Sequence, residues 1–235
     1  AATGDDQLSA LGLAPKLFRD RFRRIAALAA AVHDLGKAND HFQGMIRGER
    51  EVRVQPQGLR HEWVTVLILQ RLKPWLLPAV GGQEADWAIM EWAVVGHHPA
   101  MHQPSPPKCA APGAGVSLTV LLGHLDFRET LDWLRDTFQL TTPAPLLVDL
   151  NVPLLSADNA FQHLCQWQRE ALRLWESLAV SSPERRLIAA VKDCLIAGDV
   201  AGSALPRVAA DGPELWNWIT ESFDSRPKAD DLQLI

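Results

Sequence analysis

The residues best suited to chemistry are an adjacent histidine and aspartate, His33 and Asp34, followed closely by Gly36 and Lys37. Imidazole nitrogens and carboxylate oxygens are ligands that divalent Mn, Fe, Co, Ni or Zn ions take. Adjacent helical residues point about 100° apart, so the pair can share an ion only at the edge of a helix. A single His-Asp pair is common on protein surfaces, and its meaning therefore depends on the other polar residues of the chain.

Further candidate ligands follow downstream. His61 lies between an arginine and a glutamate, His97 and His98 are adjacent, and Asp199 follows a glycine. Most of these residues fall at expected helix ends, where a pocket between helix tips can form. The three cysteines are far apart and predict neither a disulfide framework nor a cysteine-based zinc site. The other histidines are expected to be structural or to face solvent: His41, His102, His124 and His163.

The elements that must position these residues are helices. Apolar residues recur at helical spacing from Arg21 to Leu35, and we expect Gly36 to end this helix in a left-handed conformation. We find no credible β alternation and no internal repeat, so the predicted fold is all-α, one compact helical bundle whose tryptophans pack in its core. Arg21, Arg23 and Arg24 are expected on a solvated face. Further helices are predicted over 59–73 with Pro74 as a stop, 84–95, 125–138, 158–179, 183–196 and 213–223, with a proline-rich loop over 99–115.

Composition narrows the class of protein. The 235 residues are 47% hydrophobic and 22% charged, which is typical of a globular protein and not of a disordered one. No apolar run reaches about 18 residues and no secretory signal is present, so we expect no membrane and a cytoplasmic location. Because the net charge is −5, any binding of phosphates must come from a local basic patch or from metals. The absence of an initiating methionine suggests a domain excised from a longer polypeptide.

In their order, these motifs resemble the HD nuclease domain of the CRISPR-associated helicase-nuclease of type I systems. The resemblance covers roughly residues 21–205; we expect 1–235 to form a single HD domain with 206–235 as an extension. It implies an all-α HD-domain bundle that cuts single-stranded DNA, with a helicase domain or subunit and a guide-RNA surveillance complex as partners. The residues that carry it are His33-Asp34 with Gly36-Lys37, Arg60-His61-Glu62, Gly96-His97-His98, and Gly198-Asp199 with Ser203.

The resemblance also implies two divalent ions (Mn, Fe, Co, Ni or Mg) bridged by Asp34. One ion would be held by Asp34, His61, His97 and His98. The other would be held by His33, Asp34 and Asp199, together with a histidine from an upstream helix. No histidine precedes His33 in this chain. The chain could begin after that ligand, another group such as Asp20 could replace it, or one ion could bind weakly.

This set suits phosphodiester hydrolysis. Two ions about 3.5–4 Å apart can lower the pKa of a bound water and clamp phosphate oxygens, and a carboxylate such as Asp34 can hold that separation. Lys37 can reach a phosphate oxygen as a point charge, and so can Arg60. Two alternatives stay open: an HD phosphohydrolase acting on nucleotides or cyclic nucleotides, which needs a closed pocket, and a metal-poor HD-like interaction module.

Overall fold

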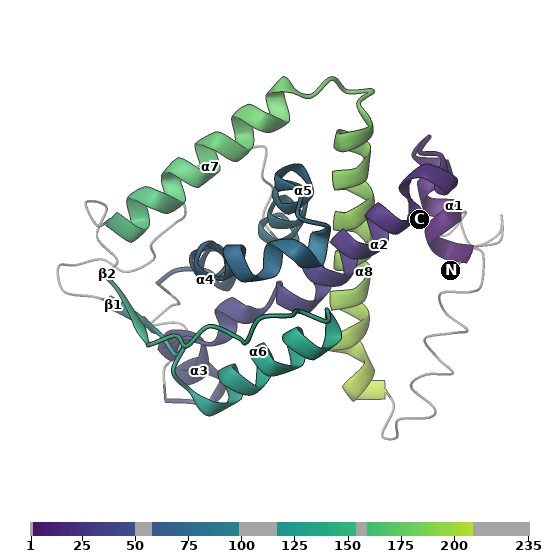
Figure 1. Cartoon of the computed structure of the whole chain (residues 1–235). Coiled ribbons are helices and arrows are strands. Elements are labelled where there is room, and N and C mark those ends of the chain that lie inside the picture. The colour runs from purple at the N-terminus through teal and green to yellow at the C-terminus, as the bar shows by residue number, and fades with distance from the viewer. Residues whose placement is uncertain (1, 50–57, 99–116, 154–158, 209–235) are drawn as a thin grey trace.

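The computed structural model describes residues 2–49, 58–98, 117–153 and 159–208, which form eight α-helices, two 3₁₀ helices and one small sheet (Figure 1). This confirms a mostly α-helical domain. In chain order the elements are α1 (Ala2–Ala10), α2 (Pro15–Val32), η1 (Leu35–Lys37), α3 (Asp40–Ile46), α4 (His61–Leu76), η2 (Leu77–Val80), α5 (Glu84–Val95), β1 (Ser117–Val120), α6 (Leu125–Thr137), β2 (Leu150–Pro153), α7 (Asn159–Ser177) and α8 (Pro183–Val208).

The core lies where α2 packs against α5 and α8 and where α4 packs against η1 and α5. Figure 1 shows α2, α4 and α5 at the centre, α7 and α6 on opposite sides of them, and α8 crossing α2. The apolar stripe of α2 is buried as predicted, with Ile25, Leu28 and Val32 fully inaccessible. Since α4 and α5 are buried along almost their whole length, the helix tips are held in fixed relative positions.

Tryptophans join the outer helices to this core. The Trp63 and Trp167 rings meet edge to face with centroids 5.9 Å apart, and Trp92 stacks on Trp175 at 5.2 Å. These contacts attach α7 to α4 and α5, which confirms a packing role for these four side chains.

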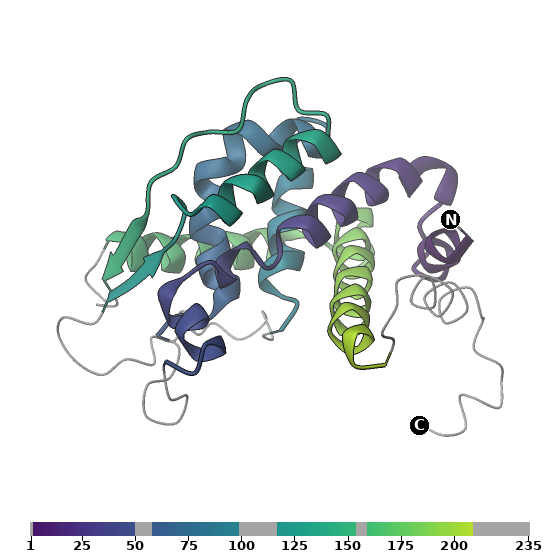
Figure 2. The same ribbon diagram turned by 90° about the horizontal axis from the view of Figure 1, so that it is seen from below.

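The sheet corrects the expectation of no β structure. β1 and β2 pair antiparallel, with Leu118 opposite Val152, at the end of the bundle away from α1 (Figure 2). Four residues per strand are too short for a clear alternating pattern, and pairing depends on a partner about thirty positions away. Asp40 attaches the sheet to α3, because its Oδ1 accepts from the Thr119 amide at 2.9 Å.

Three predicted helix boundaries are wrong. α2 begins at Pro15, which suits a first-turn position, and not at Arg21. α4 continues past Pro74 because Trp75 and Leu76 are buried, which favours another turn despite the proline. α8 runs through Gly198 to Val208. The predicted helix over 213–223 and the whole loop over 99–115 lie outside the described residues.

Arg21 does not belong to a solvated face. Its Nε donates to Asp86 at 2.7 Å, and Nη1 lies 3.7 Å from Glu184. The side chain therefore links α2 to α5 and α8. In the described part of the chain, no helix combines the length and apolar character needed to cross a bilayer.

Candidate metal centre

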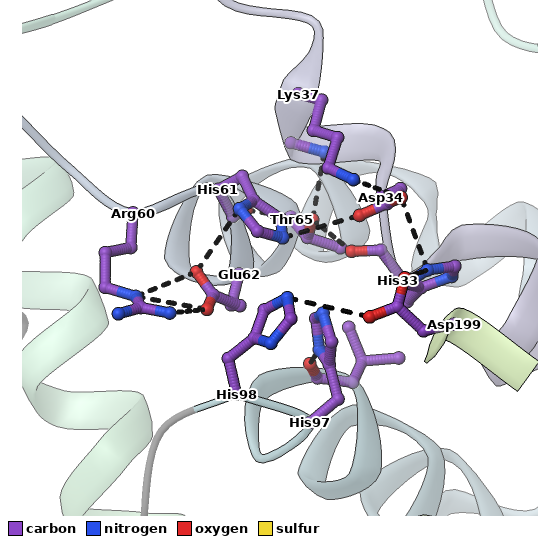
Figure 3. Close-up of polar contacts among 12 residues, drawn as sticks. His33, Asp34, Lys37, Arg60, His61, Glu62, Thr65, His97, His98 and Asp199 are labelled. Atoms are coloured by element: carbon purple, nitrogen blue, oxygen red, sulfur yellow. Dashed lines mark hydrogen bonds and ion pairs between the residues drawn. The ribbon is translucent and has the colours of Figure 1, made fainter. Parts of the chain in front are cut away.

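The centre forms where the ends of three helices meet the side of a fourth (Figure 3). α2 ends at Val32, so His33 caps it and Asp34 lies in the turn into η1. His61 opens α4, the histidine pair follows the end of α5, and one aspartate comes from the middle of α8. The structure thus brings together all six residues predicted as ligands: His33, Asp34, His61, His97, His98 and Asp199.

Asp34 lies between imidazoles from two helices. Its Oδ1 is 3.4 Å from His61 Nε2, and its Oδ2 is 3.3 Å from His33 Nε2 and 2.6 Å from Lys37 Nζ. Burial opposes ionisation, but the close approach of His33 and the hydrogen bond and positive charge of Lys37 outweigh it and hold the pKa of the Asp34 carboxyl well below its usual range. Asp34 is therefore ionised at neutral pH, with its two oxygens facing different histidines.

A second carboxylate closes the opposite side. Asp199 Oδ1 lies 3.7 Å from His33 Nε2, and Oδ2 lies 3.8 Å from His98 Nε2. Figure 3 shows the Asp34 and Asp199 carboxylates on one side of the cluster with His33 beside them, and the rings of His61, His97 and His98 on the other side. The predicted helix ended at residue 196, but α8 continues through Gly198, so Asp199 lies on a helix face.

Backbone carbonyls orient two of the rings. His33 Nδ1 is 2.8 Å from the Ala30 carbonyl oxygen, and His97 Nδ1 is hydrogen-bonded to the Val94 carbonyl oxygen. An Nδ1–H that donates to a carbonyl leaves Nε2 of the neutral ring as a free lone pair, and this is how metal-binding histidines are commonly oriented. In both residues Nε2 is therefore the atom available as a ligand.

These ligand atoms are buried and unpartnered. Five side-chain nitrogen or oxygen atoms in the described residues are buried without a hydrogen-bond partner, and the one outside this cluster is Trp87 Nε1. Leaving such an atom unsatisfied costs about 1–3 kcal/mol. Divalent cations held among these side chains would satisfy them, so the residues present fit a metal. The four atoms are His33 Nε2, Asp34 Oδ1, His61 Nε2 and His97 Nε2.

The donors form two overlapping groups, each with ligand atoms within 4.8 Å of one another. One group is His61, His97 and His98, and the other is His33, Asp34 and His97. Burial lowers the pKa of His61 to about 4 and also lowers the pKa of His97, so both rings are neutral near pH 7. For His33, burial is outweighed by Asp34 and the pKa is raised. The two groups overlap at His97, so its Nε2 can serve only one of them at a time.

Thr65 joins two of the segments that carry these ligands. Its hydroxyl oxygen accepts from the Gly36 amide at 2.9 Å and lies 3.0 Å from the carbonyl oxygens of His33 and His61. Gly36 is not left-handed as predicted, because it lies inside η1 and its φ is negative. Glycine is required by close packing: a Cβ there would lie 2.0 Å from the His61 carbonyl oxygen.

Arg60 forms an ion pair beside the centre. Its guanidinium binds Glu62, with Nη2 to Oε1 at 2.6 Å and Nε to Oε1 at 3.1 Å. The Glu62 side chain is fully buried, and its Oε2 lies 3.6 Å from His61 Nδ1. The ion pair therefore places a buried carboxylate beside Nδ1 of His61, the nitrogen that points away from the predicted metal position.

Sequence reasoning assigned no role to Thr65 or Glu62. One signal was available for Thr65, since it lies one helical turn after His61 on the same face. For Glu62, the neighbouring arginine indicated an ion pair, but its burial could not be read from the motif.

Several residues lie outside the centre. Asp20 is exposed on α2, about 20 Å along the helix axis before His33, so it does not replace the absent upstream histidine. His41 is buried and accepts from the Gly58 amide, while His124 caps α6 and His163 is exposed. His102 lies outside the described residues.

Comparisons with known proteins agree with this geometry. A family model described as "Cas3, HD domain" matches residues 5–167. The chain belongs to the Cas3 HD-domain family. It is 33% identical over 238 residues to the "Putative CRISPR-associated nuclease/helicase Cas3" of Myxococcus xanthus (strain DK1622), across 99% of this chain but 30% of that relative. No solved structure matches the chain. The Cas3 HD match includes every ligand candidate except Asp199, which the fold adds to the cluster.

Proposed function

We propose that this Cas3 HD domain is a metal-dependent nuclease that hydrolyses phosphodiester bonds of single-stranded DNA in type I CRISPR interference. The observation that carries the proposal is the set of four atoms of His33, Asp34, His61 and His97 that are buried together without a hydrogen-bond partner. Buried polar atoms without hydrogen-bond partners require an explanation, and a bound cation supplies one. The name of the Myxococcus xanthus relative, a nuclease/helicase, supports the same reaction class.

The donor set supports two ions of the Mn, Fe, Co or Ni type, because imidazole is a better ligand for these than for Mg. His61, His97 and His98 with one oxygen of Asp34 would hold the first ion. His33 and Asp199 with the other oxygen of Asp34 would hold the second. Bound there, the ions would supply a water of lowered pKa and neutralise charge on the phosphate.

The protein side chains have separate tasks. Asp34 would fix the separation of the two positions, and the neutral His61 and His97 keep their lone pairs available at pH 7. Lys37 lies at the edge of the centre with its side chain 33% exposed, within reach of a phosphate oxygen. We assign Asp34 and Lys37 as the catalytic residues on this basis.

The partners belong to the proposal as well. A net charge of −5 disfavours independent capture of a polyanion, so a helicase domain or subunit would deliver the strand after a guide-RNA surveillance complex exposes it. We place the protein in the cytoplasm with no membrane partner. Closure by the 99–115 loop would favour a nucleotide phosphohydrolase, and that loop lies outside the described residues.

The test compares Asp34→Ala with the wild type on a labelled single-stranded oligonucleotide in Mn²⁺ or Ni²⁺. We expect the variant to lose at least about 100-fold in cleavage rate and to bind less metal by elemental analysis. Asp132→Ala, which removes an exposed carboxylate on α6, is the matched control and should cleave normally. Equal cleavage by Asp34→Ala and wild type would show that the activity has another source.

A further inference from the structure

A cavity of about 310 Å³ adjoins the metal centre on the side away from Asp199. It lies between α3 and α6, beside η1, and Asp34 and Lys37 form part of its wall. A second cavity, of about 370 Å³, borders His33, Asp34 and Asp199 along α8. Asp34 therefore stands between two hollows, and a strand whose phosphate reaches the centre would place its neighbouring nucleosides toward them.

The wall of the first cavity is largely apolar. Leu35 and Phe127 are 7% and 4% exposed, and Leu121 and two alanines complete this surface. A volume near 300 Å³ is at the lower end of small-molecule sites, which suits a single base with its sugar and not a longer piece of strand. Because apolar side chains can contact the face or edge of any base, such a wall would bind without sequence preference.

The rim carries a cation, the Arg47 guanidinium. Arg47 caps the end of α3 and is exposed, and in the described part of the chain no carboxylate forms an ion pair with it. Across the cavity, the 84% exposed Asp126 on α6 would repel a phosphate, although His124 Nδ1 lies 3.6 Å from it. The charges thus place a phosphate on the α3 side of the rim, at Arg47.

We propose that this cavity is a subsite for one nucleoside of a single-stranded DNA substrate, with the base on the apolar wall and Arg47 on a backbone phosphate. The inference rests on the proposed nuclease function and adds where the strand next to the cleaved bond is held. The subsite also distinguishes a strand from a free nucleotide, because a strand would gain binding affinity from the cavity and the metal centre together.

Two substitutions test the subsite without touching a ligand. Arg47→Ala removes the rim charge, and Thr130→Phe fills the cavity from α6, where the threonine hydroxyl bonds only its own helix. The matched controls are Arg128→Ala and Glu129→Phe, which change exposed neighbours on α6 that do not line the cavity.

The measurement is the Kd of a fluorescein-labelled deoxythymidylate oligonucleotide with a phosphorothioate backbone, followed by fluorescence anisotropy in Mn²⁺. We expect Arg47→Ala and Thr130→Phe each to raise Kd about tenfold, while the two controls stay within twofold. An oligonucleotide with an abasic position in the cavity should bind the wild type as weakly as the intact strand binds Thr130→Phe. Thymidine monophosphate should bind at least tenfold more weakly than the oligonucleotide.

An unchanged Kd in both cavity variants would overturn the subsite, and so would equal losses in the controls. Tighter binding of thymidine monophosphate than of the oligonucleotide would overturn the assignment to a strand. Because binding is measured without cleavage, these outcomes are separate from a failure of the nuclease proposal, which is tested by wild-type and Asp34→Ala cleavage.

Discussion

The Gly36 amide donates a hydrogen bond to the Thr65 hydroxyl oxygen at 2.9 Å and thereby attaches the turn after α2 to the first turns of α4. Both partners are buried, and both lie next to metal-ligand candidates. The separation of His33 from His61 therefore depends on a contact that includes neither side chain.

Replacing that hydroxyl should weaken metal binding. Thr65→Val keeps the side-chain shape but leaves the Gly36 amide without its partner, so we expect a loss of about 1–3 kcal/mol in the free energy of unfolding. Affinity for Mn²⁺ should fall about 10-fold or more, as it does when groups that orient ligands are lost. Calorimetric titration and urea unfolding measure the two effects. Thr65→Ser, which retains the hydroxyl, should restore most of the affinity; wild-type affinity in Thr65→Val would refute the positioning role.

A second prediction concerns the close approach at Gly36. Gly36→Ala places a methyl group against the His61 carbonyl oxygen, so backbone must move and stability should fall by about 1–3 kcal/mol or more. The control substitution should change the stability in the opposite direction. Gly198 lies inside α8 with nothing within 4 Å of a Cβ, and Gly198→Ala should stabilise by about 0.5–1 kcal/mol. Urea denaturation measures the free energy of unfolding of both variants. A similar change in the two would argue against the tight contact at Gly36.

Metal should stabilise the fold. A cation that binds only the folded state at 100 times its Kd adds about 2.7 kcal/mol, which corresponds to a rise of roughly 5–10 °C in Tm for a chain of this size. Mn²⁺ titration followed by differential scanning fluorimetry measures this rise, and EDTA should reverse it. His97→Gln, which removes the donor common to both ligand groups, should abolish the shift. His163→Gln, at an exposed site, should keep it.

The metal-free protein should lose stability in mild acid. The pKa of His61 is about 4 when folded and 6.5 when unfolded, so the unfolded chain binds the extra proton as the pH falls from 6.5 toward 4. We expect about 1–2 kcal/mol to be lost between pH 6.5 and 5. The raised pKa of His33 acts in the opposite sense, since its contribution is present below pH 6.5 and lost above its folded pKa. His61→Gln should show a flatter pH dependence in urea unfolding; an unchanged slope would contradict a buried neutral His61.

The sequence predicted the members of the cluster because their chemistry is local to short motifs. His33-Asp34 and His97-His98 are recognisable without knowledge of the fold, and apolar periodicity correctly placed the helices that precede them. The alternating strands were missed because each is four residues long and pairs across a distant segment.

Other features could be found only in three dimensions. Gly36 was predicted to end a helix in a left-handed conformation, whereas its role is to let η1 pack closely against α4. Arg60 forms an ion pair with Glu62, whose complete burial the motif does not reveal. For Gly36 the sequence identified the residue, and its tertiary neighbour determined its role.

The position of Asp199 in the middle of α8 has a consequence for biosynthesis. A growing polypeptide can release α2, α4 and α5 from the ribosome and bury most of their shared interface before this aspartate has been translated. Contacts between residues so distant along the chain are slow to form. The second carboxylate would therefore join the cluster after the histidines of α4 and α5 are already in place.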